Sequence, residues 1–275
     1  MQLGPGPTPP PPFGTPKDPG SVRPREAPQV VTRAVTLYLR LAPRLIPIAA
    51  VVVVPMAFLR AAVVHALSQP IAPHPAPFHL TGEAPRGLGP SIAAGLVGAL
   101  FAGITSGSTR ALTARSVTQA EIGDPADVFG SMRWGARRLG SVLLVSVVAA
   151  ALYDLGLRVF VVPGVIALVW LSVSPQVVLF ERRRVIDAMS RSRSLTSGVF
   201  WHVLGVVALA FAIVLAIGIG FILALHSSWI ESWIATSVTF TITLPFYACI
   251  DVLLYLDLRS RRELVTAEDL RAEIE

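Results

Sequence analysis

The chain has 275 residues, of which 53% are hydrophobic and only 15% are charged, and its mean hydropathy is +0.65. Soluble domains carry about 25% charged residues, so this deficit predicts that much of the chain lies in a lipid bilayer. The net charge of +6 could suit nucleic acid. However, the basic residues fall between apolar runs and do not gather beside base-stacking groups, which argues against a nucleic-acid partner.

The first 28 residues are rich in proline and glycine and contain no apolar core. They therefore lack the feature that a cleavable signal peptide requires, and they cannot bury enough surface to fold alone. We expect residues 1–28 to form a disordered cytoplasmic tail and residues 29–258 to form a membrane domain. Residues 259–275 are expected to be a short polar cytoplasmic tail, with Thr266 capping a short helix.

Six apolar segments are long enough, or nearly long enough, to cross a membrane as helices of about 20 residues. The third and fourth are separated only by Arg158 and its neighbours. We therefore expect a tight hairpin, in which Asp154 and Arg158 pair across one helical turn. The six segments are Leu45–Leu67, Ser91–Leu112, Leu139–Leu157, Val159–Phe180, Val203–Leu225 and Trp233–Leu256.

The charges of the loops predict the orientation in the membrane. With a cytoplasmic N-terminus, the inner segments hold 20 of the 23 basic residues, and the outer side keeps Arg60, Arg86 and Arg158. Cytoplasmic loops carry an excess of Lys and Arg, so this distribution favours six spans with both termini in the cytoplasm. Lys17 is the single lysine, and Ala, Val, Gly and Pro are abundant. This usage is typical of a GC-rich bacterial genome, so we expect a bacterial inner membrane.

An amphipathic stretch precedes the first, third and fifth apolar segments. The three are VVTRAVTLYLRLAPRL, DPADVFGSMRWGARRLG and RRVIDAMSRSRSLTSGVFWH. Apolar residues at helical spacing, with arginines between them, suit the headgroup boundary of a bilayer. The expected fold is thus an all-α polytopic bundle of six transmembrane helices with three amphipathic interfacial helices on the cytoplasmic face. Asp124 before Pro125 is the expected N-cap of the second interfacial helix.

No catalytic motif is visible, and we expect neither an enzyme nor a cofactor. Cys249 is the single cysteine, so a disulfide within the chain and a cysteine zinc cluster are both excluded. His65, His74 and His79 could approach one another at the outer face and bind zinc, although a solvated loop is the reading we favour. We therefore predict no metal site.

Ionisable residues and helix-breaking prolines inside the apolar segments are candidates for function. Asp251 lies about one and a half turns from the cytoplasmic end of the sixth segment and is the best intramembrane polar candidate. A transporter would use such a group for coupling, whereas interfacial pairing is the alternative. Four prolines interrupt apolar segments: Pro55, Pro163, Pro175 and Pro245. The stretch VFVVPGVIALVW, which contains Pro163 and Gly164, is expected to hold the clearest helix break.

Two adjoining runs carry a resemblance. VVPGVIALVWLSVSPQVVLFE, followed by AMSRSRSLTSGVFWHVLGVV, resembles the membrane domain of bacterial glycerophosphoryl diester phosphodiesterases over about residues 30–265. In proteins that carry the enzyme, a barrel domain of at least about 200 residues follows. This chain ends ten residues after Val265, so the resemblance implies a membrane module without the hydrolase. The matching residues are Pro163, Gly164, Pro175, Glu181, Ala188, Arg191, Ser192, Leu195, Thr196, Gly198, Trp201, Asp257, Arg259 and Arg261.

The arginine-rich inner segments predict where the chain interacts. Arg191 and Ser192 could hold an anionic lipid headgroup, because Arg clamps phosphate in a bidentate manner. The alternative is that Arg191 bonds helix carbonyls or acids such as Glu181. We expect a non-enzymatic scaffold or accessory subunit that contacts lipids or partner membrane proteins; a transport component with a cavity between the helices is the alternative. The remaining candidate residues of this inner face are Arg137, Arg138, Arg182, Arg183 and Arg184.

Overall fold

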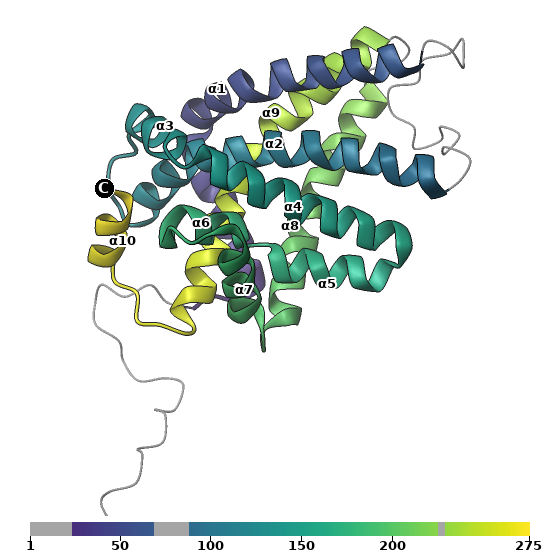
Figure 1. Cartoon of the computed structure of the whole chain (residues 1–275). Helices are drawn as coiled ribbons and strands as arrows, with labels where there is room; N and C mark the ends of the chain where they lie inside the picture. The colour runs from purple at the N-terminus through teal and green to yellow at the C-terminus, as the bar shows by residue number, and fades with distance from the viewer. Residues whose placement is uncertain (1–23, 69–87, 225–228) are drawn as a thin grey trace, which may run out of the picture.

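The computed structural model describes residues 24–68, 88–224 and 229–275. Within these ranges the chain folds into helices connected by short turns, which confirms the all-α prediction. Figure 1 shows α1, α2, α4 and α5 side by side, with α8 and α9 behind them. The helices are α1 (Ala27–Ser68), α2 (Leu88–Glu121), α3 (Val128–Ala136), α4 (Leu139–Val159), α5 (Val161–Leu171), α6 (Ser174–Glu181), α7 (Val185–Thr196), α8 (Phe200–Ala224), α9 (Trp229–Ser260) and α10 (Ala267–Ile274).

Five stretches of helix in the described chain are long and apolar enough to cross a membrane. They are Ala27–Arg60, Leu139–Arg158, Val161–Glu181, Phe200–Gly220 and Ser237–Ser260. The second predicted segment lies within α2, a continuous helix of 34 residues that is not among the five. The described part of α2 includes the polar run TSGSTR at 105–110. The five stretches are consistent with a membrane protein, and the sixth span stays a prediction.

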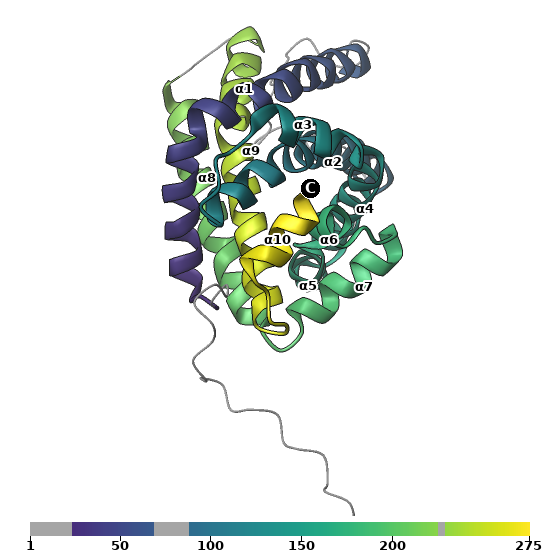
Figure 2. The same ribbon diagram turned by 90° about the vertical axis from the view of Figure 1, so that its left-hand side faces the viewer.

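The first amphipathic stretch is not a separate helix, because it forms the first half of α1. Pro43 and Pro47 lie inside α1, and proline removes a backbone hydrogen bond and bends a helix. Figure 2 shows α1 changing direction partway along its length. Helix α1 packs against α2, α8 and α9. In its first half, Val31 and Leu41 are buried while Leu39 is 66% exposed.

The second amphipathic stretch forms α3, but its N-cap is not Asp124. Asp127 caps the helix, and its side chain accepts a hydrogen bond from the Gly130 N–H at 3.0 Å. The Asp124 prediction was therefore wrong. The Asp124 carboxylate instead accepts bonds from Arg271 of α10, with Oδ2 to Nε at 2.9 Å and Oδ1 to Nη2 at 3.0 Å. Residues 124–127 are not helical, so the helix begins at Val128, three residues later than Pro125 suggests.

The predicted hairpin between α4 and α5 is confirmed, and Phe160 alone separates the two helices. Gly156 permits the close approach, because a Cβ there would lie 2.7 Å from the Cα of Gly164. The expected pair is also present, with Arg158 Nε 2.8 Å from Asp154 Oδ2. The break lies at Phe160, inside the stretch in which it was expected, while Pro163 itself lies in the first turn of α5. The chain leaves the helix at Phe160 and again at Ser172 and Val173, before Pro175 in α6.

The core is centred on α9, whose residues Val252–Leu256 are almost fully buried. The Tyr255 ring stacks on Phe180 with 5.2 Å between centroids, and Phe180 lies 5.8 Å from the Trp134 ring. The end of the chain also joins the core. The predicted Thr266 cap is confirmed as a full capping box, and α10 buries Leu270 and Ile274, so this segment is docked and not a free tail.

Candidate functional site

The short helices α3, α6, α7 and α10 gather at one end of the molecule, here called the collar end (Figure 1). Figure 2 views this end directly. It brings together the arginines that the sequence singled out, from the α3–α4 junction, the α6–α7 connection and α7. Arg138 links the α3–α4 junction to α6, since its Nη1 donates to the carbonyl of Leu179 in α6 at 2.6 Å.

Arg191 pairs with carboxylates, as the alternative interpretation of the sequence predicted. Its Nε lies 3.1 Å and 3.2 Å from the two oxygens of Glu181, and its Nη2 contacts Glu263. Glu181 also accepts a bond from Arg183 Nε at 2.7 Å and one from the Tyr255 hydroxyl at 3.3 Å. Glu181 therefore connects the end of α6 to α7 and α9 through its carboxylate.

The network continues from α9 to α10 through Arg259. Its guanidinium contacts Glu263 at 3.1 Å and Glu273 at 2.7 Å. Burial alone would raise the pKa of Glu263, but hydrogen bonds from Arg191 and Arg259 lower it below its usual value. This carboxyl is therefore charged at neutral pH, and the ion pairs hold the short helices in place.

Ser192 does not face a headgroup, which is a correction to the predicted site. The residue is fully buried, and its hydroxyl donates to the Trp170 carbonyl at 2.7 Å. Helix α7 turns this side chain toward α5 because Ser192 lies on the same side as the buried residues Ala188 and Leu195. Ser192 thus fastens α7 to α5.

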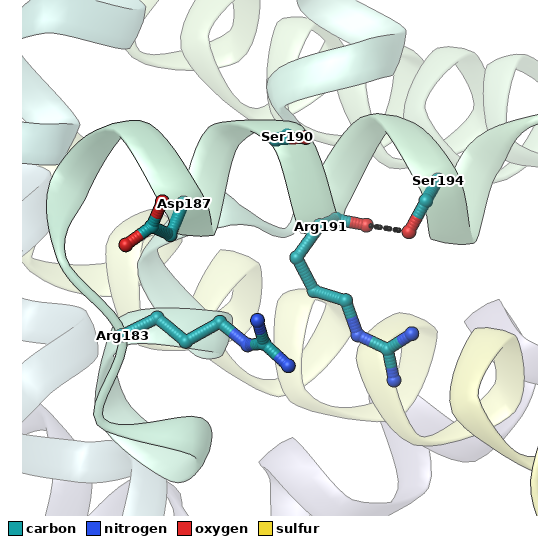
Figure 3. Close-up of a pocket in the computed structure, with 5 residues that line it drawn as sticks. All are labelled: Arg183, Asp187, Ser190, Arg191 and Ser194. Carbon is teal, nitrogen blue, oxygen red and sulfur yellow. Dashed lines mark hydrogen bonds between the residues drawn. The ribbon is translucent and has the colours of Figure 1, made fainter.

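A shallow cavity of about 340 Å³ lies over α7. Figure 3 shows the guanidinium groups of Arg183 and Arg191 extending to the same side of this helix. Asp187, Ser190 and Ser194 complete the lining, and the Ser194 hydroxyl donates to the Arg191 carbonyl at 2.7 Å. Because both arginines already pair with Glu181, and Asp187 adds a negative charge, little positive charge is left for an anion here.

A second arginine cluster at the collar end is not neutralised. Burial, then the nearby Arg182 and Arg137, lower the pKa of Arg138. Within the described residues, none of these three guanidiniums forms an ion pair, although Arg138 lies 4.4 Å from the ring centroid of Trp134. Arg182 and Arg137 are exposed, and Arg184 is exposed beside them in the chain. This cluster is named the Arg137–Arg138–Arg182 cluster.

Large apolar side chains are exposed on the helices of the same end. Phe129 of α3 is 84% exposed, Ile186 of α7 is 80% exposed, and Trp201 at the start of α8 is 80% exposed. Exposed aromatic and aliphatic groups close to arginines are the pattern of a surface that lies in the headgroup region of a bilayer.

Asp251 has a partner that the sequence did not reveal. Arg110 Nε lies 2.6 Å from Asp251 Oδ2, and the two side chains are 23% and 10% exposed. Tyr153 and Tyr247 lie near enough to interact electrostatically with both charges. Arg110 lies within α2 and faces α9.

The histidine alternative is not tested, because residues 74 and 79 lie outside the described ranges and at position 65 the structure describes only the helical backbone. Among the side chains that the structure describes, no group of His, Cys, Asp and Glu is arranged to hold a metal ion. Comparison with protein-family models, curated proteins and solved structures finds no match for this chain.

Proposed function

We propose that this chain is a non-enzymatic protein of a bacterial inner membrane that binds anionic lipid headgroups at its collar end. In this arrangement α2 is the sixth span, and the collar end and both termini lie in the cytoplasm. Two features support it: five helical stretches of sufficient length and apolarity, and the gathering of arginines at one end. We also propose that the chain is related to the membrane domain of the phosphodiesterases and acts as a membrane module without the hydrolase.

The observation that carries the lipid assignment is the Arg137–Arg138–Arg182 cluster. The charges of Arg182 and Arg137 act against that of Arg138, no carboxylate of the described residues pairs with them, and a bound anion would relieve the repulsion. Guanidinium groups match phosphate oxygens through paired hydrogen bonds. The exposed apolar side chains of Phe129 and Ile186 would enter the acyl region beside the phosphate.

The lipid assignment is tested with the purified full chain in detergent by native mass spectrometry. We expect phosphatidylglycerol to bind and phosphatidylcholine to bind weakly. Arg137→Gln/Arg182→Gln should weaken phosphatidylglycerol binding by about tenfold or more, since each charge-assisted hydrogen bond contributes about 1.5–3 kcal/mol. Arg262→Gln removes one exposed charge from the same end and should leave binding unchanged. Equal affinity in the cluster variant and wild type would refute the assignment, and stoichiometric capture of a protein there would favour the scaffold role.

The orientation is tested separately from lipid binding. Glu268→Cys is introduced in a Cys249→Ala background, because Glu268 is exposed on α10 and the native thiol is buried. A membrane-impermeant maleimide should label this chain in inverted vesicles and leave it unlabelled in intact cells. Labelling in intact cells alone would reverse the proposed orientation.

A transport function is the second candidate, because the Arg110–Asp251 pair joins two long helices inside the bundle. Charged groups at membrane depth often line ion or substrate pathways. Proton or solute flux in liposomes that Asp251→Asn abolishes, and that Asp154→Asn leaves intact, would favour this function. A chain that supports no flux but retains phosphatidylglycerol would favour the lipid-binding proposal.

A further inference from the structure

A second cavity, of about 610 Å³, lies between α1 and the connection from α2 to α3. Leu37, Leu41 and Pro43 contribute apolar surface from α1, and Ala120, Pro125 and Ala126 face them across the cavity. Ligand sites in proteins commonly enclose about 300–1,000 Å³. The cavity is therefore large enough to hold part of an amphiphilic molecule, and its wall combines these apolar side chains with charged ones.

Two arginines give this cavity its charge. Arg40 and Arg44 line it from α1, one helical turn apart, and both are exposed. Arg44 Nη1 makes a long contact of 3.4 Å with the Ala126 carbonyl, and Arg40 has no ion-pair partner among the described residues. Side chains four apart on a helix lie close enough to act on one ligand, and two guanidiniums suit a phosphate.

The lining also includes one acid, Asp124, which would cancel part of that charge if it were free. Arg271 of α10 occupies both of its oxygens, at 2.9 Å and 3.0 Å. The carboxylate is therefore compensated by a residue outside the cavity, and the net charge of the cavity rim stays positive. Arg271 acts here as a positioning residue and does not line the cavity.

An apolar stripe on α1 leads away from the two arginines. Pro47, Val51 and Val54 follow Arg40 and Arg44 at spacings of three and four residues, which places all five on one side of a helix. Val51 is 68% exposed, Val54 is 40% exposed, and Pro47 is also exposed. An apolar stripe beginning at a cationic cavity has the layout of a lipid, with a charged head and hydrocarbon chains.

We propose that this cavity binds the phosphate head of an anionic phospholipid between Arg40 and Arg44, while the acyl chains run along the exposed stripe of α1. The inference rests on the proposal that the chain spans a membrane. It does not depend on the Arg137–Arg138–Arg182 cluster, which lies on other elements. The cavity holds the head and the glycerol region, since the stripe that receives the chains lies outside it.

The test uses the full chain in detergent and phosphatidylglycerol as the probe. Arg40→Gln/Arg44→Gln should remove one bound lipid per chain, or weaken its affinity by about tenfold or more, in native mass spectra. The matched control is Arg133→Gln/Arg262→Gln, which removes the same charge from two exposed arginines outside both proposed sites and should retain the lipids that the wild type binds. Loss in the first variant alone supports the proposal, whereas identical lipid binding by the wild type and both variants overturns it. Equal loss in both variants also overturns it, because lipid binding would then follow net charge alone.

Wild-type protein provides a test that needs no variant. A phosphatidylglycerol analogue with a photoreactive group in the headgroup should label peptides containing residues 37–44 or 120–126. Labelling confined to other peptides would overturn the proposal. Inorganic phosphate at the same concentration as the lipid analogue should not reduce this labelling. If phosphate did prevent the labelling, the site would be one for free phosphate and not for a lipid.

The role of Arg271 has its own readout. Arg271→Gln should weaken binding several-fold, because the freed Asp124 carboxylate then opposes the phosphate. Adding Asp124→Asn to that variant should restore the affinity. A purely structural role of the ion pair would give no such rescue, because both variants lack the pair.

Discussion

The Arg110–Asp251 pair allows a quantitative test of how the helices are held together. Asp251→Leu would leave the Arg110 charge without a partner in the interior, since its carboxylate lies 2.6 Å away and both side chains are mostly buried. Removing one member of a buried pair costs about 3–5 kcal/mol, whereas replacing both members by apolar residues is often nearly neutral. We expect about 3 kcal/mol of destabilisation for Asp251→Leu and for Arg110→Met.

The double variant Arg110→Met/Asp251→Leu should lose only about 0–1 kcal/mol, which gives a coupling energy of about 5 kcal/mol. The free energy of unfolding is measured by titrating SDS into mixed micelles and following helix content. Asp154→Leu is the control, because its pair with Arg158 is partly exposed, at 29% and 39%, and should contribute under about 1 kcal/mol. The reasoning would be refuted if either single variant lowered the free energy of unfolding no more than this control does. It would also be refuted if the loss in the double variant equalled the sum of the two single losses.

The remaining predictions concern local structure. Gly156→Ala should destabilise the α4–α5 hairpin by about 1–3 kcal/mol, because its Cβ would lie 2.7 Å from the opposing glycine Cα. Gly98→Ala meets nothing within 4 Å and should stabilise α2 by about 0.5–1 kcal/mol, and thermal unfolding in detergent compares the two. Thr266→Ala removes the capping box and should cost α10 about 1 kcal/mol, seen as faster amide exchange in that helix alone. Arg271 holds the pKa of Asp124 below its ordinary 3.8. The pair therefore contributes fully above that pH and is lost as pH falls through the lowered value, so exchange in α10 should show an acid step that Asp124→Asn lacks.

The sequence by itself determined the features that depend on neighbours in the chain. A long apolar run predicts a helix, because lipid offers no hydrogen bonds and a helix satisfies the backbone N–H and C=O groups within the segment itself. Five such stretches are present in the described chain. The α4–α5 hairpin, its Asp154–Arg158 pair and the Thr266 cap depend on residues within a few positions of one another. Local patterns of this kind can be read without knowing how the helices pack.

Only the tertiary structure decided which polar groups meet across the bundle. Arg110 and Asp251 are 141 positions apart, and Arg271 and Asp124 are 147 apart. Such pairs depend on the rotation of each helix about its own axis, where one residue changes the direction of a side chain by about 100°. The same rotation buries Ser192 and turns Arg191 toward Glu181. In the part of the chain that the structure describes, it leaves Arg137 and Arg182 without a carboxylate partner. The sequence could thus locate an arginine-rich end, but the packing of the helices determined which of its arginines remain available to an anion.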